Sequence, residues 1–141
     1  MKKSYLCLTI IIPIVLLIGC AGSPMKLSGM TSDELQLENS FTLCNAYNYN
    51  KKETFRTELE RRNALTSEEW EMIDSGYIQV GMSEVALWCL KGGIMQGVNG
   101  SVNTTTGSWG VNKQYVYRPL GMNGPANYVY VENGKVTSWQ Y

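Results

Sequence analysis

A short apolar block follows two lysines near the amino terminus. After Lys2 and Lys3, residues 5–18 (YLCLTIIIPIVLLI) are almost wholly apolar. A helix of that length would reach roughly 21 Å at about 1.5 Å per residue, short of the ~30 Å hydrocarbon core of a bilayer. The pattern is therefore typical of a signal-peptide core and not of a membrane-spanning helix.

Apolar residues recur at helical spacing further along the chain. Leu37, Phe41 and Cys44 lie three or four positions apart. This spacing predicts a first amphipathic helix over roughly residues 33–47. The Asn-rich stretch at 45–50 is expected to interrupt the helical pattern, because Asn competes for backbone hydrogen bonds.

Three further helices are indicated by apolar spacing and by capping residues. We expect them over residues 51–62, 66–75 and 83–91. Phe55 and Leu59 share one face of the first, and its many charged residues are interpreted as a solvated face. Thr66 and Glu69 form a capping box at the start of the second, and Ser83 is the expected N-cap of the third.

The pattern changes to alternation at period two beyond the double glycine Gly92-Gly93. Strands are predicted at residues 98–105, 109–118, 127–132 and 135–140. Asn133-Gly134 is a strong hairpin signal, because both residues tolerate the positive φ of a type I′ turn. The sequence thus predicts an α+β fold, with N-terminal helices packed on one face of a C-terminal antiparallel sheet of three to four strands.

The apolar block ends in Leu17-Ile18-Gly19-Cys20, which resembles the bacterial lipobox. The resemblance implies cleavage after Gly19, a diacylglycerol thioether on Cys20 and acylation of its new amine, so palmitate is an expected modification. Several acyl chains anchor a protein durably in a membrane. The alternative is an ordinary secretory signal with an incidental cysteine.

Ala21 follows the cysteine, in place of the Asp that retains many Gram-negative lipoproteins in the inner membrane. The implied location is the outer membrane, facing the periplasm. The expected organisation is a signal peptide (1–19), a flexible tether (20–32) and a single α+β domain (33–141). We divide this domain into a helical part (33–76) and a strand-rich part (77–141).

Composition removes several function classes. Lys and Arg number 12, Asp and Glu number 12, and there is no His. Nucleic acid is not an expected partner, because phosphates attract clustered basic residues. Without His, the Ser-His-Asp and Cys-His arrangements cannot form. We therefore predict no catalytic residues, no metal site and no cofactor, and place the protein outside the enzymes.

The strand-rich part carries motifs of a known family. These are Ile78-Gln79-Val80-Gly81-Met82-Ser83-Glu84-Val85, Gln114-Tyr115-Val116-Tyr117, Tyr128-Val129-Tyr130-Val131 and Glu132-Asn133-Gly134-Lys135-Val136. In this order, and with the lipobox, they resemble the SmpA/OmlA (BamE) lipoproteins. The resemblance implies a fold shared with β-lactamase inhibitor proteins and a role as an accessory of outer-membrane protein assembly. Lys91-Gly92-Gly93-Ile94 stands where the family often has Leu-Gly-x-Pro, and residues 33–74 have no counterpart, so only fold and location are carried over.

Two of the four cysteines are expected to remain free to form a disulfide. Cys7 would leave with the signal peptide and Cys20 would be lipidated, which leaves Cys44 and Cys89. Each lies on the apolar side of its predicted helix, and an oxidising compartment favours a disulfide between them. Two separate buried thiols remain the alternative. A nucleophilic cysteine is disfavoured, because no His exists to activate it.

Aromatic residues supply the candidate binding surface, namely Trp109, Tyr115, Tyr117, Tyr128 and Tyr130. If helices cover one face of the sheet, aromatic side chains on the other face would form an exposed patch for an envelope protein. The alternative is cross-strand pairing that only stabilises the sheet. We expect a structural or protein-interaction module. An inhibitor or scavenger that binds another protein through its sheet is the alternative.

Overall fold

The computed structural model describes residues 24–94, 100–118 and 125–141. Within these ranges the helices are α1 (Pro24–Leu27), α2 (Ser32–Leu35), α3 (Ser40–Asn50), α4 (Glu53–Arg61), α5 (Ser67–Ser75) and α6 (Glu84–Lys91). The strands are β1 (Gly100–Gly107), β2 (Gly110–Tyr117), β3 (Asn127–Glu132) and β4 (Lys135–Gln140). The predicted signal peptide, Cys20 and the first residues of the predicted tether lie outside the described residues.

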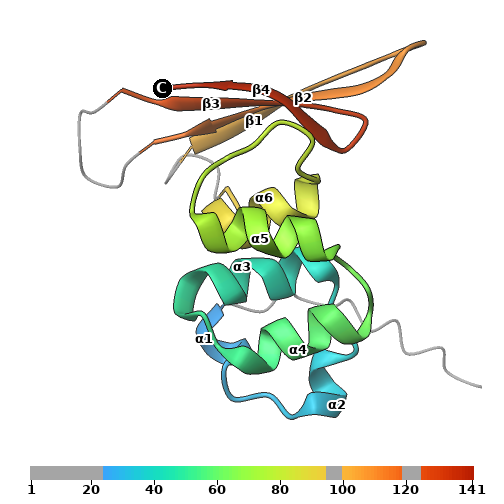
Figure 1. Ribbon diagram of the computed structural model, residues 1–141, viewed down its shortest axis with the longest axis vertical. Coiled ribbons are helices and arrows are strands. Elements are labelled where there is room, and N and C mark those ends of the chain that lie inside the picture. Colours follow the sequence, from blue (N-terminus) through green and yellow to red (C-terminus); the bar gives the residue numbers. More distant parts are fainter. Residues whose placement is uncertain (1–23, 95–99, 119–124) are drawn as a thin grey trace, which may run out of the picture.

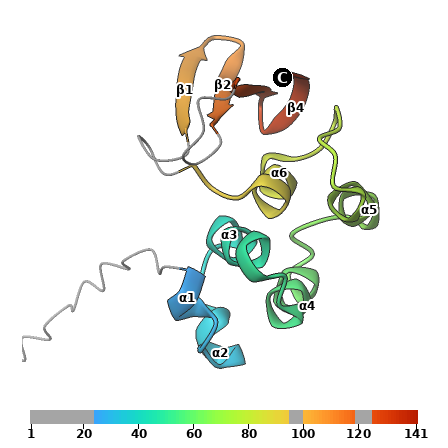
Figure 2. The same cartoon turned by 90° about the vertical axis from the view of Figure 1, so that its left-hand side faces the viewer.

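The strands form one antiparallel sheet in the order β1-β2-β3-β4. Figures 1 and 2 show the sheet at one end, α5 and α6 beneath it, then α3 and α4 with α1 beside them, and α2 farthest from the sheet. The α+β fold class predicted from the sequence is confirmed, with helices on one face of the sheet. Helix α6 lies between the sheet and α3, so it links the two parts of the domain.

The single helix predicted over 33–47 is wrong, because the chain forms two helices there. Asn39 is the N-cap of α3, and its side chain accepts a hydrogen bond from the Thr42 amide at 2.9 Å. Leu37 lies between the two helices with 88% of its surface exposed. The local cap therefore outweighed the apolar spacing that suggested a continuous helix.

The Asn-rich stretch does not interrupt α3, contrary to expectation. Asn48 donates a hydrogen bond to the carbonyl of Leu90 at 2.5 Å, and Asn45 accepts one from the Gly93 amide at 2.8 Å. The Asn side chains therefore bind the end of a neighbouring helix and do not compete with their own backbone. Gly92 has a φ of 79°, and a Cβ there would lie 2.8 Å from the side-chain oxygen of Asn48.

The expected tether over 20–32 is also corrected within the described residues. Pro24–Leu27 is helical, and Leu27 is buried in the core. Asn50 donates a hydrogen bond to the hydroxyl of Ser28 at 2.6 Å. The ordered domain therefore includes α1, because one buried leucine and side-chain contacts fix a segment whose composition resembles a linker.

The other predicted helices are confirmed by their buried faces. Phe55 and Leu59 of α4 are buried, and so are Trp70 and Ile73 of α5. Ser83 caps α6 through a hydrogen bond from the amide of Ala86 at 3.1 Å. In α5 and α6 the local capping signal agrees with the apolar spacing, whereas α4 has no side-chain cap and depends on its buried apolar face.

The hairpin between β3 and β4 has the predicted turn. Asn133 and Gly134 have φ values of 48° and 79°, the positive values that a type I′ turn requires. Val129, Val131 and Val136 of these strands are buried against the helices. The bounds of β3 and β4 agree with the prediction, whereas β1 ends two residues later than predicted and β2 is one residue shorter at each end. Residues 98 and 99 of the first predicted strand lie outside the described residues.

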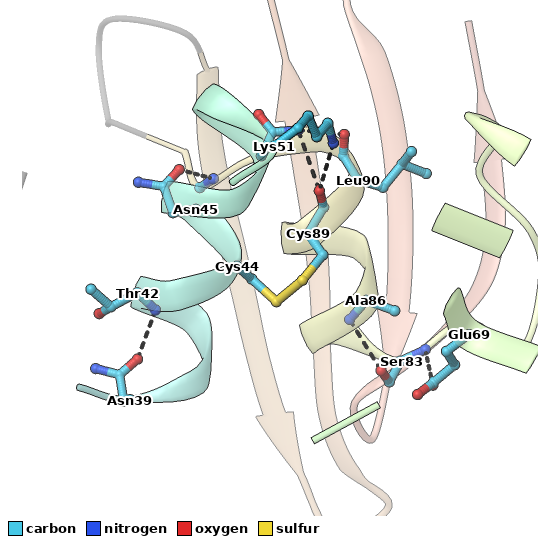
Figure 3. Close-up of a disulfide and its surroundings, with 12 residues drawn as sticks. Asn39, Thr42, Cys44, Asn45, Lys51, Glu69, Ser83, Ala86, Cys89 and Leu90 are labelled. Carbon is cyan, nitrogen blue, oxygen red and sulfur yellow. Dashed lines mark hydrogen bonds between the residues drawn. A yellow bond between two sulfur atoms is a disulfide. The ribbon is translucent and has the colours of Figure 1, made fainter. Parts of the chain in front are cut away.

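A disulfide joins α3 to α6, as Figure 3 shows. The sulfur atoms of Cys44 and Cys89 are bonded, and both residues are 0% exposed. The pairing predicted from the sequence is present in the structure. The bridge closes a loop with a sequence separation of 45 residues and holds the helical part against the helix that supports the sheet.

A buried carboxylate links α4 to α2. Glu58 accepts hydrogen bonds from Arg61 at 2.7 Å and from Arg62 at 2.6 Å. Arg62 also donates to the backbone carbonyls of Leu35 and Glu38, so it satisfies the end of α2. The hydrogen bond from Arg61, with the contribution of Arg62, outweighs burial and lowers the pKa of Glu58 to about 2.

Replacing Cys44 and Cys89 by Ala should lower the free energy of unfolding by roughly 4 kcal/mol, since the loop would no longer restrict the unfolded chain. Urea unfolding of the wild type and the double variant measures this difference. Reductant should destabilise the wild type and leave the variant unchanged. Complete alkylation of both thiols in the non-reduced wild type would contradict the bridge.

Glu58 should make the free energy of unfolding depend on pH in the acidic range. Its pKa in the folded protein lies below its ordinary value. The stabilisation is therefore present above about pH 4.3 and is lost as the pH falls toward 2. Glu58→Gln should have a lower melting temperature at pH 7 and a smaller further loss over that acid range. Glu53→Gln, an exposed change on the same helix, is the control and should follow the wild type.

Candidate functional site

The predicted aromatic surface is divided between the two faces of the sheet. Tyr115 and Tyr117 face the helices and are only 2% and 8% exposed. Placing them in a partner-binding face is therefore wrong. Residues two apart on a strand share a face, and this face is the one that α6 covers.

The two buried tyrosines have structural partners. Tyr115 donates a hydrogen bond to the carboxylate of Glu84 and accepts one from the indole of Trp88 at 3.3 Å. Tyr117 donates to the carbonyl of Gly92 at 3.5 Å. Burial, with the neighbouring charge of Glu84, raises the pKa of both hydroxyls. Both tyrosines therefore stay protonated and join the sheet to α6.

Tyr128 and Tyr130 lie on the opposite, outer face. They alternate with the buried Val129 and Val131 along β3, and both are half-buried. The described helices pack on the other side of the sheet (Figures 1 and 2). These two residues are therefore the part of the predicted aromatic surface that the sheet itself presents outward.

Polar side chains cross all four strands on this outer face. Asn103 of β1 donates to Gln114 of β2 at 2.9 Å, and Gln114 donates to the hydroxyl of Tyr130 on β3 at 3.2 Å. Gln140 of β4 donates to the same hydroxyl at 2.8 Å. We call these four residues the polar ladder. No pattern along the chain predicts the ladder, because the register that aligns its residues is set by strand pairing.

A shallow hollow of about 210 Å³ accompanies the ladder. Its walls include Asn103, Gln114 and Tyr130, with Thr105 and Asn112 beside them. Most of its side chains are uncharged amides and hydroxyls. The outer face is therefore a polar surface with exposed ring area and not the apolar aromatic patch that was expected.

Trp109 occupies the turn between β1 and β2 and is 77% exposed. Figure 1 shows this hairpin extending sideways past the helices. We call residues 106–111, the part of the hairpin beyond the pairing of β2 with β3, the hairpin arm. Asn133 braces it, because its backbone amide donates to the carbonyl of Val111 and its side chain accepts from the Val111 amide. Trp109 is therefore a large, exposed aromatic side chain at the tip of a hairpin that Asn133 holds by two hydrogen bonds.

Two buried carboxylates secure the sheet to the helices. Glu69 accepts hydrogen bonds from the Ser83 amide at 2.9 Å and from Lys135 at 3.0 Å. Burial alone would raise the pKa of Glu69, but these bonds, with that from Thr66, lower it. Glu69, which the sequence placed in the capping box with Thr66, therefore also binds the sheet. Glu84 forms the second link, through Lys113 at 2.6 Å.

Neither carboxylate is arranged for chemistry. Each has a lysine partner and helps to hold the fold. Within residues 24–94, 100–118 and 125–141, no three His, Cys, Asp or Glu side chains are grouped as metal ligands. The helices of the same described ranges are too short or too polar to cross a bilayer.

No family model, curated protein or solved structure matches the chain. The resemblance to SmpA/OmlA lipoproteins therefore stays a prediction that rests on the motifs. The outer face of the sheet and the hairpin arm are the candidate interaction surfaces, and their geometry is the basis for a functional proposal.

Proposed function

We propose that this chain is a lipid-anchored protein of the bacterial outer membrane that faces the periplasm and acts as a non-catalytic protein-interaction module. The motif Leu17-Ile18-Gly19-Cys20 after an apolar block supports the anchor. The exposed Trp109 on its braced arm is the observation that carries the interaction role. A part in outer-membrane protein assembly is the specific role that the SmpA/OmlA-like motifs suggest.

The position of α1 gives the proposed anchor a direction. Pro24 begins α1, so a lipid-modified Cys20 would lie within about 14 Å of extended chain from the domain. Helices α1 and α2 lie at the end of the molecule remote from the sheet (Figures 1 and 2). The helical end would therefore lie near the membrane, and the sheet with its arm would point into the periplasm.

Trp109 has the properties of an interaction anchor. Large aromatic residues contribute much of the binding energy of protein interfaces, since they bury a wide area with little loss of side-chain freedom. The indole lies over Gly107, where a Cβ would come within 3.0 Å of its ring nitrogen. This contact helps to hold the ring in place before a partner arrives, which reduces the entropic cost of binding.

An inhibitor or scavenger is the second candidate function. It is favoured by the outer face of the sheet, which presents Tyr128 and Tyr130 beside the hollow. Such a protein would occlude its target through this face and not through the hairpin arm. Cross-linking from the two surfaces distinguishes the candidates.

The anchor is tested by labelling cells with palmitate. Wild-type protein should incorporate the label and remain with the membrane fraction, and its mature sequence should begin at Cys20. Cys20→Ser should lose the label and be released from the membrane, because no thioether can form. Cys7→Ser is the matched control and should behave as wild type. An unlabelled wild-type protein that retains residues 1–19 would contradict lipidation.

The interaction role is tested by photo-cross-linking in intact cells. A photoreactive residue at Thr106 on the arm should form a covalent adduct with one envelope protein. Trp109→Ala should reduce that adduct at least about tenfold, if the indole contributes a typical hot-spot energy. Trp139→Ala, an exposed tryptophan on β4, is the control and should leave it unchanged. Adducts from position 128 alone would favour the inhibitor, and none from either position would refute both candidates.

A further inference from the structure

The polar ladder presents a hydrogen-bond donor that has no acceptor among the described residues. The hydroxyl of Tyr130 accepts hydrogen bonds from Gln114 at 3.2 Å and from Gln140 at 2.8 Å. Both bonds use its oxygen as acceptor, so its own proton remains available. The two amides fix the position of the oxygen, and the phenol offers its proton to a ligand on the outer face.

Acceptors lie on both sides of this donor. Asn103 and Gln140 use their amide nitrogens within the ladder. No group in the described part of the chain donates to their side-chain oxygens, so these oxygens can accept from a ligand N–H or O–H group. Adjacent strands are about 4.8 Å apart, so Asn103 on β1 is two strand spacings from Tyr130 on β3, and Gln140 on β4 is one. The ladder therefore offers alternating uncharged donors and acceptors in a fixed row.

The charges around the hollow disfavour an anionic ligand. Lys113 and Lys135 are the nearby cations, and their ammonium groups are held by Glu84 and Glu69. Glu132 lies exposed at one end of the hollow. A phosphate or an acidic peptide would meet this carboxylate without a free lysine to offset it. A neutral ligand with many hydroxyl groups has no such penalty.

We propose that the outer face binds a neutral oligosaccharide that carries acetamido groups, through the polar ladder. The phenol of Tyr130 donates to an acetamido carbonyl, and the amide oxygens of Asn103 and Gln140 accept from N–H and hydroxyl groups. Tyr128 is two residues along the same strand on the same face, and its half-exposed ring supplies the apolar surface on which a sugar ring stacks.

This binding goes beyond the proposed protein interaction and uses a different surface. Trp109 is at the tip of the arm, whereas the ladder crosses the body of the sheet. An extended peptide is a poorer fit, because its backbone forms ladders in the plane of a sheet and not across its face. With the helical end near a membrane, the outer face would be turned toward a glycan in the surrounding space.

The test is NMR titration of the detergent-solubilised full-length protein with chitotetraose. Backbone and side-chain amide signals of Asn103, Gln114, Tyr130 and Gln140 should shift. Cellotetraose, which has hydroxyl groups but no acetamido groups, should bind at least about tenfold more weakly, as expected for a lost hydrogen bond that leaves a polar group unpaired.

Variants decide whether the ladder is responsible. Tyr130→Phe keeps the ring but removes the donor, so it should weaken chitotetraose binding about tenfold. Tyr77→Phe, the same change at an exposed tyrosine between α5 and α6, should have no effect, and neither should Trp109→Ala. The folded state of each variant is checked by its amide spectrum. Gln114→Leu provides a second test if Tyr130→Phe does not fold.

Three outcomes would overturn the proposal. One is the absence of shifts at about 10 mM sugar, where even a weak millimolar site would be filled. Another is equal binding of the two sugars or shifts away from the outer face. The last is stronger binding of an acetylated tetra-alanine peptide to the same residues. None of these outcomes bears on the adducts formed through Trp109, so the two proposals fail independently.

Discussion

The contact between α3 and α6 is the constraint on which the rest of the structure depends. Helix α6 supports the sheet on one side and meets α3 on the other. A buried disulfide joins the two helices through Cys44 and Cys89. Asn48 binds the carbonyl of Leu90 in the last turn of α6, and Asn45 binds the amide of Gly93 just beyond the helix. The covalent bond and these amides together fix the end of the helix, so the sheet is held at a defined place above the helical part.

The side chains on the inner face of the sheet consequently serve to attach the sheet to the helices. Glu69 and Glu84 reach from the helices to lysines on the strands, and Tyr115 adds a hydrogen bond to Glu84. A buried carboxylate with several hydrogen bonds is costly to disturb, because removal of one partner leaves an unpaired charge. These links leave two surfaces of the sheet that the described helices do not cover. The outer face carries the polar ladder, and the hairpin arm carries Trp109, each on a rigid support.

Prediction from sequence succeeded where local signals agreed with one another and failed where a distant partner decided the outcome. The capping box of α5 and the Asn133-Gly134 turn each depend on interactions among only a few neighbouring residues. Both are present as predicted. Asn48 was misjudged, because its hydrogen-bond acceptor is a carbonyl of α6. The segment around Leu27 resembled a linker, because its burial depends on a core that its own composition does not reveal.

The sequence by itself determined the α+β class and the two closing strands, and it favoured the pairing of the two domain cysteines that the structure contains. Apolar period, turn chemistry and the shared apolar side of two helices are properties of short segments. Tertiary structure alone decided which aromatic residues are accessible. Tyr115 and Tyr130 both alternate along strands, yet one is enclosed by α6 and the other faces outward. Period two separates the faces of a sheet, but only the packing of the helices selects the face that they cover.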